Sequence, residues 1–329
     1  MTSQWRKGII VPASAAAIRR AADILRDGGL VALPTETVYG LAANAGRGNA
    51  VARIFEVKGR PAFNPLICHV TGREMANRCI EIPPVADRLM AAFWPGPLTL
   101  VLPKRPDAPV SDLVSAGLDT LAVRAPAHAT TRQVLFALDR PVAAPSANRS
   151  GRISPTAARH VAEDLGEDVD LILDGGACAV GLESTIVGVE ADGGLTLLRP
   201  GGVTVADIED VAGVRVAPAG KGGVTAPGQL ASHYAPQSSL RLNARTAEPV
   251  EIMIGFGDTP GAFSLSPDGD LVEAATGLFA TLREADALAQ SEGRTLAVAP
   301  IPERGLGVAI NDRLRRAATP PLDSHSPRR

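Results

Sequence analysis

Residues 30–41 read LVALPTETVYGL, and this stretch points to the fold class. Its first five residues predict a short apolar strand that a proline ends, and a polar segment follows directly. An amphipathic helix is expected before it, over residues 15–28, because apolar residues recur every three or four positions until Gly28-Gly29. Helical periodicity returns over residues 49–58. A strand flanked by helices in this way is typical of an α/β fold.

The same alternation continues to about residue 211. A helix is expected over residues 156–165, with Ser154 as its N-cap and Pro155 in its first turn. We therefore predict a mixed α/β domain over residues 1–211, with polar residues at its strand ends. Short apolar runs predict the remaining strands of this domain, which are LICHV (66–70), LTLVLP (98–103), TLAVRAP (120–126), PVAAPSA (141–147), DLILDGG (170–176), STIVGVE (184–190) and LTLLRPG (195–201).

The amino-acid composition of the chain changes after residue 211. Residues 212–240 are rich in Gly, Pro and Ala and have neither helical nor strand periodicity, so a linker or lid is expected there. A small open α/β domain is predicted over residues 241–329. Its expected elements are strands in RLNA (241–244), EIMIGFG (251–257), GAFSLS (261–266) and LAVAPIP (296–302), and helices over residues 274–292 and 309–318.

Composition excludes several classes of protein. The chain has 329 residues, which at roughly 100–200 residues per domain predicts two domains. Hydrophobic residues make up 45% and charged residues 21%, so disordered and fibrous classes are excluded. The formal net charge of -2 argues against an extended basic surface that would bind nucleic acid non-specifically. Aromatic residues make up only 3%, so each tyrosine inside a motif is informative.

The cysteines and the apolar runs indicate a cytoplasmic protein. Cys68, Cys79 and Cys178 have no CxxC spacing, so we expect buried, reduced thiols and no zinc site. No apolar run suits a signal peptide, and none reaches the ~18 residues of a membrane helix. The P-loop, HExxH and GxSxG motifs are absent, and GFGDTPG at residues 255–261 does not fit GxGxxG.

Polar and basic side chains gather in short Pro- and Gly-punctuated segments. Lys58 and Arg60 lie two residues apart in KGRP, where an anion such as phosphate would relieve their repulsion. A solvated surface loop is the alternative for such a pair. Asn64 and His69 follow, although a single histidine in an apolar strand is more often a core residue. Arg124 lies between apolar neighbours in a predicted strand, so it should face an anion or a carboxylate.

Further segments carry hydroxyl and amide groups. Thr35 and Thr37 follow a strand and either hydrogen-bond a small polar ligand or cap the turn. Residues 144–156 read APSANRSGRISPT and supply Ser, Asn and Arg side chains ahead of a predicted helix. This composition suits the binding of an anionic group, and a plain polar loop is the alternative. Tyr234 lies in the predicted linker, where a large aromatic is expected to dock as a lid.

Seven motifs occur in a recognisable order, namely PTETVYGL, KGRPxxxPLxxH, WPGPLT, AVRAP, PSANRSGxxSPT, EST and LRPG. Together they resemble the YrdC-like family, the threonylcarbamoyl-AMP synthases. SHYAP in the linker, followed by a domain ending GLGVAINDRLRRAA, resembles the long two-domain form of that family. The resemblance implies a twisted mixed-sheet domain with a concave basic cavity, plus a smaller C-terminal open α/β domain.

The resemblance also implies an activity. Members of the family are nucleotidyltransferases that condense L-threonine, bicarbonate and ATP to threonylcarbamoyl-AMP and pyrophosphate. The product serves the threonylcarbamoyladenosine modification of tRNA. It implies Mg²⁺ bound with ATP and no protein-only metal site. The product would pass transiently to a tRNA threonylcarbamoyl transferase complex, with no direct tRNA binding required and no membrane association.

The site residues follow from the same motifs. Lys58 and Arg60 are the implied catalytic residues. The implied threonine contacts are Thr37, His69, Arg124, Ala144 through its backbone, and Ser184. The implied ATP contacts are Lys58, Arg60, Asn64, Thr120, Ser146, Asn148, Ser154, Arg199 and Tyr234.

Two other functions stay open from the residues alone. The first is an RNA-binding module without catalysis, which the scarcity of aromatics and of basic stripes argues against. The second is a carbamoyl-adenylate transferase that acts on another acceptor. A requirement for both threonine and bicarbonate in pyrophosphate release would exclude the first alternative, and inactivity with carbamoyl phosphate would exclude the second.

Overall fold

The computed structural model describes residues 9–220 and 233–319. Contacts divide the chain into two compact units, residues 1–149 with 154–229 and residues 150–153 with 230–329. The three-part division predicted from the sequence stays a prediction, since the middle of the expected linker lies outside the described residues. No helix in residues 9–220 and 233–319 is long and apolar enough to cross a membrane.

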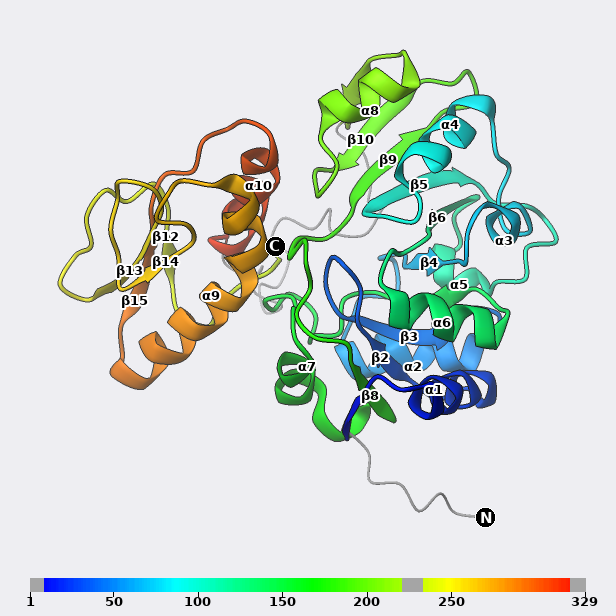
Figure 1. The fold of residues 1–329 in the computed structure, drawn as a ribbon, viewed down its shortest axis with the longest axis horizontal. Helices are drawn as coiled ribbons and strands as arrows, with labels where there is room; N and C mark the ends of the chain where they lie inside the picture. The colour runs from blue at the N-terminus through cyan, green and yellow to red at the C-terminus, as the bar shows by residue number, and fades with distance from the viewer. Residues whose placement is uncertain (1–8, 221–232, 320–329) are drawn as a thin grey trace, which may run out of the picture. The chain divides into compact units, whose positions relative to one another are not determined.

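The first unit is built on a mixed sheet (Figure 1). The described strands follow the order β1-β8-β2-β3-β7-β4-β6-β5-β9-β10-β11, with parallel pairs such as β4 with β6 and antiparallel pairs such as β5 with β6. The strands are β1 (Ile10–Pro12), β2 (Val31–Leu33), β3 (Gly40–Asn44), β4 (Ile67–His69), β5 (Leu98–Pro103), β6 (Thr120–Arg124), β7 (Val142–Ala143), β8 (Leu171–Asp174), β9 (Thr185–Val189), β10 (Leu195–Arg199) and β11 (Val216–Pro218).

Helices cover this sheet and form its core. On one face, Leu25 and Leu135 from two helices pack with Val31 of β2. On the other face a larger cluster includes Val51 and Leu89 from two further helices. The helices of this unit are α1 (Ala15–Asp27), α2 (Gly48–Lys58), α3 (Arg73–Asn77), α4 (Pro84–Phe93), α5 (Asp112–Ser115), α6 (Ala129–Leu138), α7 (Ala158–Leu165) and α8 (Val205–Ala212), with a short 3₁₀ turn η1 (Gly166–Asp168).

The second unit is a small parallel sheet with two long helices. Its strand order is β12-β15-β13-β14, and each neighbouring pair is parallel. The segment 150–153 belongs to this unit, where the Ala235 N–H donates to the Gly151 carbonyl at 2.8 Å. The elements are β12 (Leu240–Arg241), β13 (Glu251–Gly255), β14 (Phe263–Ser264), α9 (Leu271–Glu292), β15 (Thr295–Val298) and α10 (Leu306–Ala317).

The predicted α/β class, a mixed-sheet domain with a smaller second domain, is confirmed. Two local predictions are wrong. Ser154 is not a helix N-cap, because α7 begins at Ala158 after an N-cap at Ala157, and the Ser154 hydroxyl donates instead to Glu183. The predicted linker also contains a strand, since residues 216–218 form β11 beside β10. Pairing with a strand already in place supplies the order that the local sequence lacks.

Candidate active site

One face of the sheet carries the predicted threonine-binding side chains. His69 and Arg124 lie directly opposite each other on the parallel strands β4 and β6. Side chains alternate between faces along a strand, so residues two apart share a face. His69 and Arg124 therefore share the face of Ile67 and Ala122, which belong to a small buried apolar cluster.

The same face extends across β5 and β9. Thr99 is two residues from Val101 of the apolar cluster, and Ser184 is two residues from Ile186. The Thr99 and Ser184 hydroxyls lie 2.7 Å apart. Adjacent strands thus place His69, Arg124, Thr99 and Ser184 in one row on one face of the sheet.

Arg124 is the centre of this row. Its side chain is buried and its guanidinium forms an ion pair with Glu36, with 2.6 Å between Nη2 and the carboxylate. Nη1 donates to the Thr37 hydroxyl at 2.8 Å, and Nε donates to the Gly96 carbonyl at 3.1 Å. Glu36 is therefore the carboxylate expected opposite a buried arginine in an apolar strand.

Glu36 is held in its charged form. Burial by itself would raise the pKa of this carboxyl, but the charge and hydrogen bonds of Arg124 bring the pKa below its ordinary value. The Ala127 N–H also donates to the carboxylate at 3.0 Å. The loop between β2 and β3 is thereby fixed against the end of β6.

His69 is a buried neutral imidazole. Its Nδ1 lies 3.3 Å from the Ile67 carbonyl. Burial, and then the nearby charge of Arg124, lower the pKa of His69 to about 3. At neutral pH the ring therefore carries no charge and presents one donor and one acceptor.

This pKa predicts how stability depends on pH. The folded-state pKa of about 3 lies below the ordinary value of 6.5, so the unfolded chain binds the extra proton as the pH falls. We expect the contribution of His69 to stability to be complete above pH ~6.5 and to be lost progressively toward pH ~3, with a slope of up to about 1.4 kcal/mol per pH unit. Chemical denaturation at several pH values should show a shallower slope in His69→Gln than in the wild type. An equal slope in both proteins would contradict this account of the buried imidazole.

Arg199 extends the row to β10. Its Nε and Nη2 donate to the Ser184 carbonyl at 3.1 and 3.0 Å, and Nη2 lies 3.2 Å from the Ser184 hydroxyl. The side chain is buried. Arg199 thus fixes the backbone and the hydroxyl of Ser184 together.

Lys58 and Arg60 lie at the end of α2. Gly59 ends the helix with a left-handed φ of 60°, which favours glycine and turns the chain between the two cations. The Lys58 ammonium is buried and donates to the carbonyls of Ser146 and Asn148. Burial is the main cause that lowers the pKa of Lys58 well below its ordinary value, and the charge of Arg60 lowers it further. Arg60 therefore lies close enough for its charge to act on Lys58.

In the segment after α2, one buried side-chain amide makes no hydrogen bond. Arg60 donates to the carbonyls of Asn64 and Pro65 at 3.1 and 2.8 Å. The Asn64 side chain is fully buried, and neither its Oδ1 nor its Nδ2 has a hydrogen-bond partner among residues 9–220 and 233–319. Buried amides are almost always bonded, so this one points to a ligand.

The remaining predicted residues occupy several loops and strands of the first unit. The Asn148 amide donates to the Arg149 carbonyl at 2.9 Å, and Ser146 forms an isolated bridge with Gly40. Thr120 begins β6 on the same face as Ala122 and Arg124. The Ala144 N–H donates to the Ile67 carbonyl at 3.0 Å.

Tyr234 belongs to the second unit. Its ring is buried against Phe279, with centroids 5.5 Å apart, and the Arg313 guanidinium lies 5.5 Å from its centre. The backbone at Tyr234 has a left-handed φ of 64°, which is uncommon for a residue with a bulky side chain. Its role as a lid over the nucleotide stays a prediction.

The sequence interpretation missed three polar residues of this region. They are Glu36, Thr99 and Glu183, whose partners are Arg124, Ser184 and Ser154. Each lies inside one of the seven motifs of the sequence. For Glu36, the sequence feature that could have identified it is Arg124, which needs a carboxylate partner if it is buried. Among the described residues no group of three or more His, Cys, Asp or Glu could hold a metal ion.

Comparison with known proteins defines the class. A family model described as "Telomere recombination" matches residues 23–201, and a second, "Threonylcarbamoyl-AMP synthase, C-terminal domain", matches residues 203–319. The chain belongs to the Sua5/YrdC family of threonylcarbamoyl-AMP synthases, in its long two-domain form. The predicted family and the predicted enzyme class, nucleotidyltransferase, are confirmed.

Individual relatives match over most of their length. The chain is 44% identical to threonylcarbamoyl-AMP synthase of Pyrococcus abyssi, covering 92% of this chain and 94% of the relative. It is 38% identical to the Bacillus subtilis enzyme, covering 92% of each. The crystal structure of P. abyssi Sua5 complexed with L-threonine superposes with a TM-score of 0.84 at 42% identity, covering 94% of this chain and 97% of that structure.

Proposed function

We propose that this chain condenses L-threonine, bicarbonate and ATP into threonylcarbamoyl-AMP and pyrophosphate. The observation that carries the proposal is the row of polar side chains around Arg124 on one face of the sheet. Its relatives carry the name of this enzyme, and one similar structure is complexed with L-threonine. We further propose that the product serves the threonylcarbamoyladenosine modification of tRNA.

Arg124 is the proposed anchor of the threonine carboxylate. A guanidinium has five N–H donors. The hydrogen bonds to Thr37 and Gly96 use two of them, and Nη2 forms the ion pair with Glu36. The remaining donors would bind a carboxylate while Glu36 stays in place. Thr37, Ser184 and the backbone of Ala144 would then contact the rest of the amino acid.

His69 is a proposed positioning residue. A group with a pKa of about 3 is too weak a base to take the proton of an ammonium group efficiently near neutral pH. We therefore assign it hydrogen bonding to threonine. The amine then forms a C–N bond to the carbon of bicarbonate, with loss of water overall, and this gives the N-carboxylated amino acid.

The second step needs no enzyme nucleophile. An oxygen of the carbamate attacks the α-phosphorus of ATP, and the bond to the departing pyrophosphate breaks. Lys58, Arg60 and Arg199 would stabilise the negative charge on the phosphates. The other proposed ATP contacts are Asn64, Thr120, Ser146, Asn148, Ser154 and Tyr234.

Magnesium and partners complete the proposal. Mg²⁺ would bind mainly through the phosphates of ATP, the hard oxygen ligands that it prefers, and would neutralise part of their charge. The adenylate would pass transiently to a tRNA threonylcarbamoyl transferase complex, without direct tRNA binding by this chain. We place the reaction in the cytoplasm, where ATP and tRNA meet.

Asn64→Leu separates stability from binding. Leucine has nearly the shape of asparagine but needs no hydrogen bond. We therefore expect nucleotide-free protein to gain about 1 kcal/mol of stability while the Kd for ATP rises about tenfold. Chemical denaturation and calorimetric titration measure the two effects. Unchanged ATP affinity would show that Asn64 does not contact the nucleotide.

Pyrophosphate release tests the reaction itself. Release should require ATP, threonine and bicarbonate together, and omission of any one should abolish it. An RNA-binding module would release none under any combination. A carbamoyl-adenylate transferase would instead accept carbamoyl phosphate in place of threonine plus bicarbonate.

A further inference from the structure

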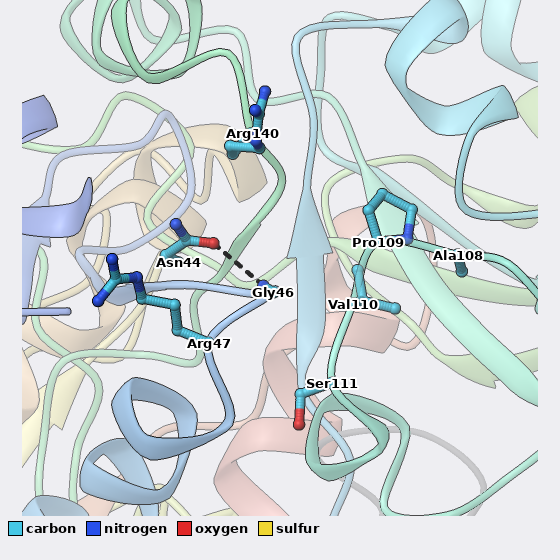
Figure 2. A pocket seen from close by; sticks show the side chains of 8 residues that line it. All are labelled: Asn44, Gly46, Arg47, Ala108, Pro109, Val110, Ser111 and Arg140. Carbon is cyan, nitrogen blue, oxygen red and sulfur yellow. Dashed lines mark hydrogen bonds between the residues drawn. The ribbon is translucent and has the colours of Figure 1, made fainter. Parts of the chain in front are cut away.

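A cavity of about 430 Å³ opens between the start of α2 and the segment before α5 (Figure 2). Asn44, Arg47, Ser111 and Arg140 are among the residues that line it. None of its lining residues is acidic, and none belongs to the proposed ATP or threonine contacts. The volume lies within the range of about 300–1,000 Å³ that is usual for small-molecule sites.

A buried amide donor faces this cavity. The Asn44 side chain is only 8% exposed. Its Oδ1 accepts a hydrogen bond from the Gly46 N–H at 3.1 Å, so Nδ2 points away from Gly46, as Figure 2 shows. Nδ2 has no hydrogen-bond partner in the described part of the chain. The Asn44 side chain is therefore nine-tenths buried, and its Nδ2, on the cavity wall, is accessible to a ligand in the cavity.

The start of α2 lies at the same cavity. The helix has 11 residues, and no side chain caps its N-terminus at Arg47. The first turn lies against Ser111, since a Cβ added at Gly48 would come 3.3 Å from the Ser111 hydroxyl oxygen. The Ala50 N–H is bonded to the Asn49 side-chain oxygen at 2.9 Å. The other N–H groups of the first turn and the helix dipole favour an anion at this position.

The charges at the cavity have the same sign. Arg47 donates to the backbone carbonyl of Asp27 at 3.3 Å, and a carbonyl has no formal charge to offset that of the guanidinium. Arg140 donates to the Asp139 carbonyl at 2.6 Å and lies 3.7 Å from the Asp139 carboxylate. Asp139 is also 3.9 Å from Arg78. Exposed ion pairs of this kind are weak, so the Arg140 guanidinium can turn toward a bound anion. Arg47 can do the same by giving up one exposed hydrogen bond to a backbone carbonyl.

We propose that this cavity binds a small phosphate-bearing anion. The phosphate would lie at the start of α2 and accept hydrogen bonds from the Asn44 amide and the guanidinium groups of Arg47 and Arg140. Inorganic diphosphate and the phosphate of a nucleotide share this chemistry. The site is separate from the proposed catalytic residues and does not depend on their assignment.

Hydrogen exchange measured by mass spectrometry tests the site directly. Inorganic diphosphate and AMP are added in separate experiments, and exchange is followed in the peptides that contain residues 44–51 and 58–65. Protection of residues 44–51 by either compound supports the proposal. The compound that protects them shows whether the cavity takes free diphosphate or the phosphate of a nucleotide. Protection of residues 58–65 reports on the proposed ATP contacts instead. No protection of residues 44–51 by either compound at millimolar concentration overturns the proposal.

Variants fix the assignment to these side chains. In Arg47→Ala/Arg140→Ala, half-maximal protection of residues 44–51 should need at least about tenfold more anion, while Arg47→Lys/Arg140→Lys keeps most of the binding. Asn44→Asp, which adds a negative charge to the cavity wall, should abolish protection in protein shown to be folded by circular dichroism. Pyrophosphate release should be unchanged in the double alanine variant. Protection equal to that of the wild type in both the double alanine variant and Asn44→Asp would contradict the site.

Discussion

Arg60→Ala is expected to lower the turnover number by about 100-fold or more while the protein stays folded. The Arg60 side chain donates to the backbone carbonyls of Asn64 and Pro65, which fixes the guanidinium beside the end of α2. Lys58 lies close enough for Arg60 to lower its pKa. A triphosphate beside both cations would gain most when charge moves onto the leaving pyrophosphate, so the loss should fall on turnover.

Steady-state pyrophosphate release at saturating substrates measures this effect. Arg73→Ala is the matched control, because Arg73 is an exposed arginine paired with Asp87, and its replacement should leave turnover unchanged. Arg60→Lys, which keeps the charge but loses the planar fork, should fall between the two. Wild-type turnover in folded Arg60→Ala would refute the phosphate role.

Arg124→Lys is expected to raise the KM for L-threonine by about 100-fold. Lysine keeps the positive charge beside Glu36, so the buried carboxylate is not left unpaired. A single ammonium cannot hold Glu36, Thr37, Gly96 and a substrate carboxylate in the geometry of a guanidinium. The loss should therefore appear in threonine binding more than in the KM for ATP.

Glu36→Gln is the matched variant for this prediction. Glutamine still accepts a hydrogen bond from Arg124 but no longer offsets its charge, so threonine binding should be retained. Initial rates over a range of threonine concentrations compare the two proteins. A wild-type KM for threonine in Arg124→Lys, or an equal rise in Glu36→Gln, would contradict the assignment of Arg124 as the carboxylate anchor.

Part of the fold could be predicted because local signals agreed with tertiary structure. The helix at α1 has apolar spacing, an N-cap serine at Ser14 and a terminal Gly28, and it forms as expected. In contrast, β3 reads GLAAN, and small residues with a glycine give little strand signal. Its place between β2 and β7 supplies the order that its sequence does not indicate.

The site shows the same limit. A buried arginine in an apolar strand predicts a partner, but the chain does not say that the partner is Glu36, 88 positions earlier. Ser154 resembles an N-cap in its local context, yet its hydroxyl bonds to Glu183, 29 residues away in sequence. Spacing therefore indicates which residues need partners, and tertiary packing decides which partners they obtain.

Mass spectrometry of the product formed from ¹³C-bicarbonate tests the synthase assignment most directly. Purified protein with ATP, L-threonine and the labelled bicarbonate should yield threonylcarbamoyl-AMP that carries one heavy carbon. Formation of AMP or ADP alone, or of an adenylate without the label, would contradict the proposed reaction.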